Sequence, residues 1–193
     1  MRRDFTRESY WNLFRRAAAA ISGRLRGWLY LKMGVFSSAP GSRLIIGKGA
    51  EIKNGRNVYI QGKVKIGNFA RIECHPLGEG CQPGSIILSD EVSLGNDVHI
   101  GAVSEITLDP GVLLGSNILL IDHSHGEPKA DVFDFEELPK RRRLSSKGKI
   151  IIGRNVWICD GAVVLGGVAI SQGVIIGANA TVRSNVCEGT IYL

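Results

Sequence analysis

The chain has 193 residues, of which 25 are glycine, 44% are hydrophobic and 22% are charged. This length fits one domain with a single core, and the composition excludes collagen-like, wholly disordered and integral-membrane classes. The formal net charge of +6 resides in residues 1–32, which hold eight Arg or Lys against Asp4 and Glu8, so that 16 basic and 16 acidic residues cancel elsewhere. A neutral body does not predict a nucleic-acid-binding protein.

Residues 1–43 are predicted to form an N-terminal amphipathic helical segment that ends in a run of turn-forming residues. Its apolar residues alternate spacings of three and four, as on one face of a helix: Trp11, Phe14, Ala18, Ile21, Leu25 and Trp28. We expect this helix to cover the open strand edge of the following domain. The alternative is that residues 1–32 contact an anionic membrane surface, because basic residues with Trp and Leu are typical of interfacial helices.

Residues 44–193 repeat a six-residue unit, most regularly from Ile152 onward. The first position is aliphatic: Ile152, Ile158, Val164, Ile170, Ile176 and Val182. The fifth is small or β-branched: Val156, Ala162, Val168, Val174, Ala180 and Val186. The period recurs upstream with slips: Ile46, Ile52, Ile60, Ile66, Ile72, Leu88, Leu94, Ile100, Leu108, Leu114 and Leu120. Neither the helical period of 3.6 nor the strand period of 2 fits this spacing.

A six-residue period predicts a β-solenoid of short strands, with three units in each triangular coil and the first residue of each unit pointing inward. Turn residues that accept a left-handed conformation punctuate the units: Gly49, Gly55, Asn68, Asn96, Asn117, Asn155, Gly161, Gly167, Gly173, Asn179 and Asn185. Two stretches interrupt the repeat, at residues 73–87 and 121–149. We expect both to leave the solenoid as loops, because buried irregular backbone would lack hydrogen-bond partners.

The isoleucine-led hexapeptides, the run Asn155-Val156-Trp157-Ile158 and the segment 174–179 resemble the hexapeptide-repeat acyltransferases. The similarity is greatest to their sugar O-acetyltransferase branch, which includes maltose, galactoside, capsule and lipopolysaccharide acetyltransferases, and it covers about residues 44–190. The resemblance implies an all-β fold, a left-handed parallel β-helix, with acetyl-CoA as donor, a sugar or glycan as acceptor and no metal. It also implies a homotrimer with active sites between subunits.

The longer interruption opens with two histidines, His123 and His125. The resemblance implies that a histidine at the start of this loop is the general base, with His123 in the better-matching position. Acetyl transfer from a thioester to a hydroxyl needs a proton acceptor whose pKa lies near neutrality, and imidazole supplies one. The tetrahedral oxyanion also needs a donor, typically a backbone N–H. The alternative is that both histidines are ordinary exposed loop residues.

Further site residues follow from the same resemblance. Trp157 is expected near the acetyl-donor channel, and Ala178 is expected to contact pantetheine through its backbone. Arg183 and Ser184 occupy positions of polar contacts to coenzyme A, although relatives commonly carry Thr-Lys there. An outward aromatic packed under the long loop is the alternative for Trp157.

Two residues are candidates for contacts with the acceptor, namely Asp122 and Ser104. The loop between residues 121 and 149 is acidic in its first half and basic in its second, from Lys140 to Lys149. We expect either a solvated loop or a basic segment that meets the phosphates of the coenzyme or an anionic glycan.

The cysteine and histidine counts bear on the location of the protein and on alternative functions. The four cysteines, Cys74, Cys81, Cys159 and Cys187, are too few and too unevenly spaced for a disulfide scaffold, which favours free thiols and a cytoplasmic location, with the inner face of the membrane as a variant. Zinc-dependent γ-class carbonic anhydrases share the expected solenoid and need three converging imidazoles, and the chain has four histidines. A non-catalytic scaffold or binding module is the remaining alternative.

Overall fold

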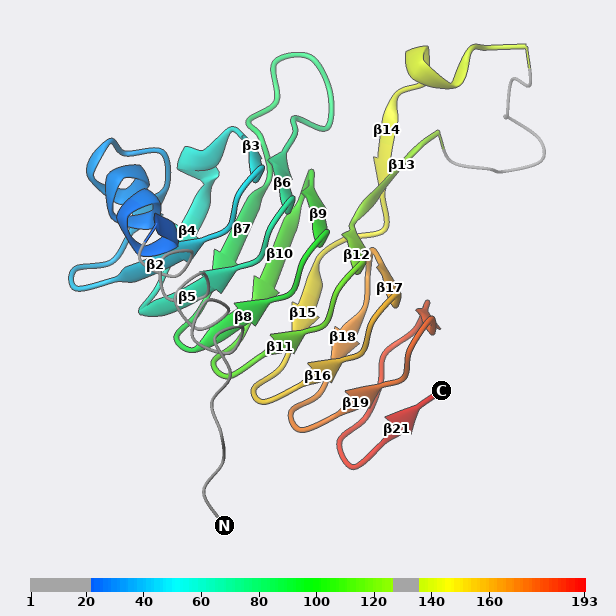
Figure 1. The fold of residues 1–193 in the computed structure, drawn as a ribbon. Coiled ribbons are helices and arrows are strands. Elements are labelled where there is room, and N and C mark those ends of the chain that lie inside the picture. The colour runs from blue at the N-terminus through cyan, green and yellow to red at the C-terminus, as the bar shows by residue number, and fades with distance from the viewer. Residues whose placement is uncertain (1–21, 127–135) are drawn as a thin grey trace, which may run out of the picture.

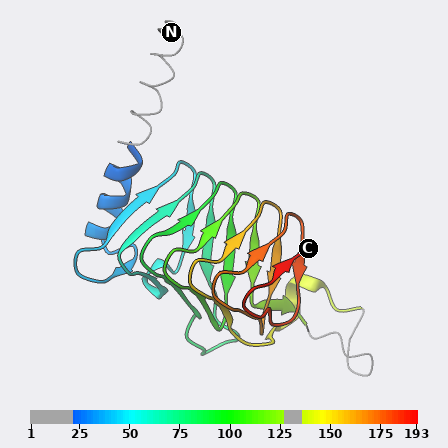
Figure 2. The ribbon, with the colours of Figure 1, turned by 90° about the horizontal axis from the view of Figure 1, so that it is seen from below.

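A computed structural model describes residues 22–126 and 136–193 of the chain. The body is a parallel β-solenoid whose coils stack along one axis, with the helical end and the C-terminus at opposite ends (Figures 1 and 2). Each coil contributes one short strand to each of three parallel sheets, which form the three faces of a prism. The solenoid predicted from the six-residue period is therefore confirmed.

The strands of each sheet follow one another at intervals of one coil. The first sheet contains β1 (Ser37–Ser38), β4 (Val58–Ile60), β7 (Ser85–Leu88), β10 (Glu105–Leu108), β15 (Ile150–Ile152) and β18 (Ala169–Ile170). The second contains β2 (Arg43–Ile46), β5 (Lys63–Ile66), β8 (Val92–Leu94), β11 (Leu113–Leu114), β16 (Trp157–Ile158), β19 (Ile175–Ile176) and β21 (Ile191–Tyr192). The third contains β3 (Glu51–Lys53), β6 (Arg71–Cys74), β9 (His99–Ala102), β12 (Leu119–Ile121), β17 (Val163–Leu165) and β20 (Thr181–Val182).

The core consists of the aliphatic ladders that the repeat predicts. All first-position and fifth-position residues from Ile152 to Val186 are buried, and so are the upstream first-position residues apart from Ile52, which is partly buried. Equivalent residues stack in register from coil to coil, as in the pairing of Ile72 with Ile100 and of Ile100 with Leu120. One coil cannot enclose its own apolar residues, so stacking creates this core.

The turns differ in part from the expectation. Seven of the predicted turn residues adopt the left-handed conformation: Gly49, Asn117, Asn155, Gly161, Gly167, Gly173 and Asn179. At two other turns the left-handed residue is the next one along, Phe69 (φ 56°) or Asp97 (φ 55°). There the asparagine acts through its side chain: Oδ1 of Asn68 accepts a hydrogen bond from the backbone N–H of Lys48 at 2.9 Å, so it joins two coils.

Both interruptions of the repeat project from the prism, although regular strands reach further into them than expected. The first leaves the coil between β6 and β7, at residues 75–84, and a hydrogen bond from the N–H of Gly84 to the carbonyl of His75 closes its base. The second carries an antiparallel hairpin of β13 (His123–His125) and β14 (Leu144–Ser146), which extends away from the solenoid (Figure 1). Two short 3₁₀ helices occur at η1 (Gly55–Asn57) and η2 (Pro139–Arg141).

Residues 22–32 form a helix against the first coil. Arg26 donates a hydrogen bond to the carbonyl of Ile46 on β2 at 2.7 Å, and Gly27 approaches the backbone of Leu44 so closely that a Cβ would clash there. The helix thus covers β2 as expected, but the predicted apolar stripe is not the buried face, because Leu25 and Trp28 are both more than half exposed. The other stripe residues, Trp11, Phe14, Ala18 and Ile21, lie outside the described residues.

Within residues 22–126 and 136–193, no helix has the length and apolar character needed to cross a membrane.

Candidate active site

The candidate site begins where the chain leaves the third sheet after β12. Asp122, the first residue beyond this strand, is fully buried. Its Oδ1 accepts a hydrogen bond from the N–H of Val103 at 2.8 Å, and its Oδ2 accepts one from the N–H of Ser104 at 2.8 Å. These backbone donors belong to the corner of the preceding coil, so the carboxylate satisfies buried N–H groups that would otherwise lack partners.

The same carboxylate orients His123. Oδ1 of Asp122 lies 3.2 Å from Nδ1 of His123, whose side chain is 9% exposed. Because an ionised carboxylate only accepts hydrogen bonds, Nδ1 carries the proton and Nε2 is left with a free lone pair. The arrangement can therefore take up a proton at Nε2, and the buried negative charge stabilises the imidazolium that results.

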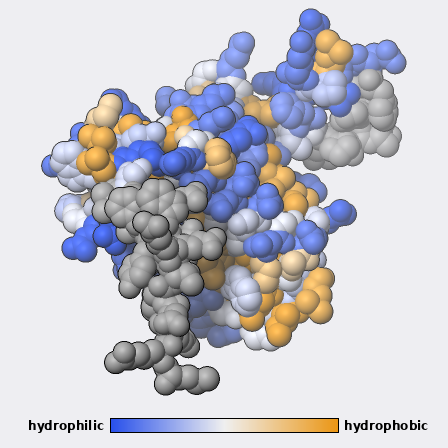
Figure 3. All heavy atoms as spheres, viewed as in Figure 1, coloured by the Kyte–Doolittle hydropathy of each residue, from blue (hydrophilic) through white to orange (hydrophobic). Residues whose placement is uncertain are grey.

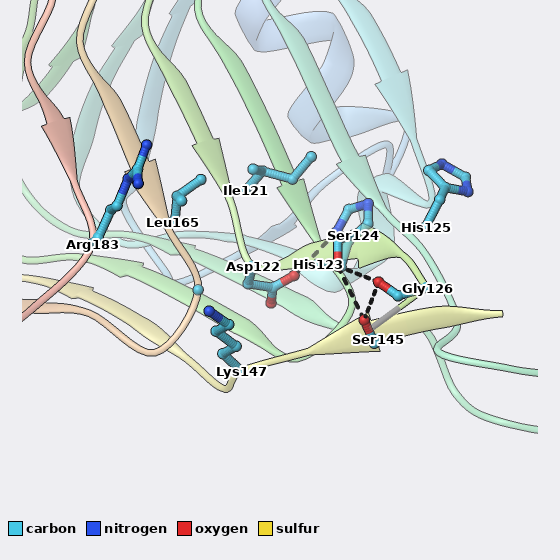
Figure 4. Close-up of a pocket in the computed structure, with 11 residues that line it drawn as sticks. Ile121, Asp122, His123, Ser124, His125, Gly126, Ser145, Lys147, Leu165 and Arg183 are labelled. Carbon is cyan, nitrogen blue, oxygen red and sulfur yellow. Dashed lines mark hydrogen bonds and ion pairs between the residues drawn. The ribbon is translucent and has the colours of Figure 1, made fainter. Parts of the chain in front are cut away.

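His123 faces a pocket of about 410 Å³ beside the hairpin (Figure 4). The pocket is lined by Ile121, Asp122, His123, Ser124, His125, Gly126, Ser145, Lys147, Leu165, Gly166 and Arg183. Ile121 and Leu165, which pair in register on β12 and β17, provide an apolar wall, while Lys147 and Arg183 add positive charge. Such a pocket suits a long ligand with an apolar segment and an anionic group.

Hydroxyl groups hold the hairpin that frames this pocket. Ser124 and Ser145 both donate hydrogen bonds to the carbonyl of Gly126, at 2.9 and 3.0 Å (Figure 4). Ser146 donates one to the carbonyl of Asp122 at 2.6 Å. His125 lies on the same strand as His123 but is exposed and points away from it (Figure 4). Among the residues that the structure describes, His123 has a buried carboxylate partner and His125 has none.

The predicted site residues separate into two groups. Asp122, His123, His125 and Arg183 line the pocket, whereas Ser104, Trp157, Ala178 and Ser184 do not. Trp157 lies on β16 in the second sheet, on another face of the prism from the His123 corner. Asp122 was expected to contact the acceptor, but its enclosed carboxylate is occupied by backbone N–H groups and His123, so it is placed to orient the imidazole instead.

A polar cluster beside His123 was not part of the predicted catalytic site. Arg71 and Glu73 on β6, His75 after it and His99 on β9 gather on the outer face of the third sheet. Nη2 of Arg71 lies 2.8 Å from Oε2 of Glu73, and Nε2 of His99 lies 3.1 Å from the same oxygen. The rings of His75 and His123 have centroids 5.8 Å apart. The sequence does contain a signal for His99. It lies one coil before Leu119 in the repeat, so the spacing places it beside β12, the strand that leads to His123.

Burial and neighbouring charges shift the pKa values of this cluster. Burial would raise the pKa of Glu73, but the charge of Arg71 and the hydrogen bond with His99 outweigh it and lower the pKa. Burial lowers the pKa of His75, helped by the charge of Lys53, and burial with the charge of Arg71 lowers the pKa of His99. The cluster at neutral pH thus has an ionised carboxylate beside two neutral imidazoles.

Three histidines, His75, His99 and His123, lie near one another beside the pocket, as metal-binding imidazoles would. In the described ranges 22–126 and 136–193, no group of three His, Cys, Asp or Glu side chains has an arrangement that could hold a metal ion. All four cysteines are free thiols. Burial raises the pKa of the Cys74 thiol to about 12, with a contribution from the negative charge of Asp122.

Comparison with known proteins identifies the repeat. Residues 149–184 match the family model of the bacterial transferase hexapeptide (six repeats). WbbJ of Escherichia coli, whose name describes an O-acetyl transferase of lipopolysaccharide biosynthesis, is 33% identical over 109 residues, or 56% of each chain. A Mycobacterium tuberculosis protein named as an acetyltransferase is 28% identical over 182 residues, which cover 94% of this chain and 52% of that protein. The chain therefore spans about half the length of these curated relatives.

Solved structures place the fold. A mutant of AntD, an N-acyltransferase from Bacillus cereus solved with dTDP-4-amino-4,6-dideoxyglucose and coenzyme A, superimposes with a TM-score of 0.66 at 19% identity. The match covers 83% of this chain and 80% of that one. Together with the hexapeptide match, this likeness confirms the predicted fold class, an all-β left-handed β-helix preceded by a helix.

Proposed function

We propose that this chain, with its hexapeptide-repeat β-helix, is an O-acetyltransferase that moves an acetyl group from acetyl-CoA to a hydroxyl of a glycan or polysaccharide precursor. The observation that carries the proposal is the Asp122–His123 pair, held at the edge of a pocket with an apolar wall and two cations. The names of the curated relatives support the same reaction, since both describe acetyl transfer. The donor is a thioester, so no metal is needed.

In the proposed mechanism, Nε2 of His123 removes the proton from the acceptor hydroxyl as its oxygen attacks the thioester carbonyl carbon. A tetrahedral oxyanion forms, for which a backbone N–H is the expected donor. Collapse of the oxyanion breaks the carbon–sulfur bond, and the imidazolium returns its proton to the departing thiolate. Asp122 remains ionised throughout, because its role is to fix the tautomer of His123 and stabilise the imidazolium.

The walls of the pocket suggest how the donor binds. Ile121 and Leu165 offer an apolar surface to the pantetheine arm of coenzyme A, and Lys147 and Arg183 offer positive charge to the phosphates of the coenzyme. Arg183 keeps the donor-binding role that the resemblance implies for it. Ser184 follows it at an exposed position, within reach of a coenzyme that extends past Arg183.

The proposed assembly is a homotrimer in which the second sheet of one subunit approaches the site of its neighbour. Along the C-terminal coils this sheet presents an outward row in register: Leu113, Trp157, Ile175 and Ile191. Three of the four are at least 46% exposed, and hydrophobic surface gathers over this end of the prism (Figure 3). In this arrangement Trp157 and Ala178 of one subunit complete the donor channel at His123 of another, and cyclic symmetry closes the ring.

The proposed location is the cytoplasm, where acetyl-CoA is available and free thiols persist. A peripheral contact with the inner membrane face is the finer proposal, and the exposed Leu25, Trp28 and Leu29 of the N-terminal helix, with Met33 just after it, support it. Co-sedimentation with vesicles of anionic phospholipid tests it. The full chain should pellet with the vesicles, and the Trp28→Ser variant should pellet less; equal pelleting would contradict the contact.

The proposed function is tested by thioester consumption with a panel of glycoside and oligosaccharide acceptors. Wild-type protein should release coenzyme A in the presence of at least one acceptor, and it should bind coenzyme A in a calorimeter. The His125→Ala variant is the matched control and should keep activity that His123→Ala loses. Failure to bind coenzyme A, together with failure to use any acceptor, would favour a non-catalytic scaffold.

A further inference from the structure

The polar cluster on the third sheet lies on the opposite side of His123 from the proposed donor walls. In the sheet register, Glu73 pairs with Gly101, Gly101 with Ile121, and Ile121 with Leu165. This row therefore runs from a carboxylate, across a glycine, to two aliphatic side chains. His123 follows Ile121 by two residues, so it sits where the polar and apolar parts of the row meet.

Gly101 lies between the polar and apolar parts of the row, beneath the imidazole of His123. A Cβ at this position would lie 3.2 Å from Cε1 of His123, 3.6 Å from Nε2 of His99 and 3.7 Å from a side-chain carbon of Ile121. Any larger residue would therefore crowd the imidazole, so the glycine allows His123 to lie against the sheet beside His99.

The polar cluster beside His123 includes three hydrogen-bonding side chains that are in part exposed to solvent. The side chains of Glu73, His75 and His99 are 15%, 22% and 27% exposed. In the part of the chain that the structure describes, the contacts of Glu73 with Arg71, His75 and His99 all fall on Oε2, which leaves Oε1 as an acceptor. The two imidazoles add ring nitrogens that can donate or accept.

We propose that Glu73, His75 and His99 form the acceptor subsite and bind hydroxyl groups of a neutral sugar ring next to the hydroxyl that His123 deprotonates. This inference rests on the proposed function and deepens it, because it assigns the substrate class on one side of His123. A carboxylate oxygen and two imidazoles match the alternating donors and acceptors of neighbouring hydroxyls. Arg71, 2.8 Å from Glu73, balances the charge of the carboxylate, so the cluster has no excess positive charge to hold an anionic sugar, which makes neutral rings the preferred class.

The apolar part of the row supports separate binding surfaces for the acceptor and the donor. Ile121 and Leu165 offer no hydrogen bonds to a sugar, whereas they suit the hydrocarbon of a pantetheine arm. Acceptor and donor would then approach His123 from opposite directions along the third sheet. This geometry fits direct transfer, in which both substrates must contact the same imidazole at once.

The test is sugar binding in the absence of donor, measured by saturation-transfer NMR with a panel of neutral methyl glycopyranosides and methyl glucuronide. Glu73→Gln preserves the shape of the side chain and removes its charge, and Glu51→Gln is the matched control, since Glu51 is an exposed carboxylate on the same sheet face. We expect wild type and Glu51→Gln to bind a neutral glycoside at least about tenfold more tightly than Glu73→Gln does, as for a lost charge-assisted hydrogen bond.

The outcomes separate this inference from the proposed function. If wild type binds no neutral glycoside, binds the glucuronide more tightly, or binds as tightly as Glu73→Gln, the subsite assignment is wrong even if acetyl transfer is found. If Glu73-dependent binding is seen but acetyl-CoA is not used, the subsite stands and the proposed reaction fails. With an active enzyme, Glu73→Gln should raise the KM for the acceptor about tenfold while the KM for acetyl-CoA stays unchanged; the reverse pattern would overturn the subsite.

Discussion

The carboxylate of Asp122 links His123 to the backbone of the neighbouring coil. One of its oxygens lies 3.2 Å from Nδ1 of His123, and the two oxygens together accept hydrogen bonds from the N–H groups of Val103 and Ser104. The orientation of the proposed base is therefore fixed by the stacking of the solenoid itself rather than by the hairpin alone.

Replacing Asp122 with asparagine should reduce both activity and stability. The amide N–H of asparagine would face one of the two backbone N–H groups that Asp122 now binds. That backbone donor would lose its buried hydrogen bond, and the free energy of unfolding should fall by about 1–3 kcal/mol. The tautomer of His123 would no longer be fixed, and kcat should fall by about 10²- to 10⁴-fold. Denaturant unfolding and steady-state kinetics measure the two effects.

The matched control for that variant is Asp160→Asn. Asp160 also accepts a hydrogen bond from a corner N–H, that of Ser116 at 2.8 Å, but it is exposed and the described structure gives it no histidine partner. We expect its kcat to stay within about twofold of wild type, an effect below 0.5 kcal/mol. Equal losses in both variants would mean that Asp122 acts only through stability.

The four thiols should differ in their reaction with a disulfide reagent at pH 8. Cys81 and Cys187 are exposed and should react within the first phase, whereas Cys74 is buried and its pKa is raised to about 12. A thiol with so high a pKa holds almost no reactive thiolate at pH 8. Mass spectrometry of the labelled peptides after a short exposure measures the order, and early labelling of Cys74 would contradict the packing around it.

Acid should destabilise the protein through the cluster beside His123. The folded-state pKa values of His75 and His99 are lowered, so the unfolded chain binds more protons as pH falls through their ordinary value of 6.5. Glu73 has the same sign, because its lowered pKa gives stability that is present above 4.5 and lost below. Thermal unfolding between pH 7.5 and 4 should show a falling midpoint.

The histidine part of this dependence can be isolated by mutation. A variant with His75→Gln and His99→Gln should lose less stability than wild type between pH 7.5 and 5.5, where only the imidazoles change charge appreciably. Because Glu73 is retained, both proteins should become less stable below about pH 4.5. Parallel curves for wild type and variant over the upper range would show that the two imidazoles are not the source.

Mixed oligomers should test the shared site. His123→Ala removes the proposed base, and Trp157→Arg places a charge on the opposite wall of the proposed donor channel. Each variant alone should be inactive, while mixed trimers formed after subunit exchange should regain partial activity at sites that combine two intact walls. A monomeric mass by light scattering, or no recovery after exchange has been verified, would contradict the site between subunits.

Periodicity predicted the solenoid well because burial repeats with every coil. A buried ladder such as Ile152, Ile158 and Val164 leaves a strict signal at six residues, since each position packs against its equivalent in the next coil. The local backbone was predicted less well: at Asn68 the left-handed residue is Phe69, because the asparagine side chain is used to join two coils. Sequence spacing does not distinguish these two uses of asparagine.

Sequence reasoning named Asp122, His123, His125 and Arg183, which the structure brings to one pocket, but it did not place the polar cluster beside His123 in the catalytic site. Asp122 was expected to contact the acceptor, because the burial that gives it a positioning role beside His123 is visible only in the structure. Glu73 and His99 are 26 residues apart and meet only because β6 and β9 stack in register. The insertion at residues 75–84 breaks the count between those coils, and the register across it is visible only in the structure.

The most direct test is the acetyl-transfer rate of His123→Ala measured beside its affinity for coenzyme A. With the best acceptor of the panel, wild type should transfer acetyl groups, and His123→Ala should lose at least about 10²-fold in kcat, as expected for a general base. Coenzyme A should bind wild type and variant equally in a calorimeter, and both should unfold at the same temperature. A folded His123→Ala protein that binds coenzyme A and retains the wild-type kcat would contradict the assignment of His123 as the base.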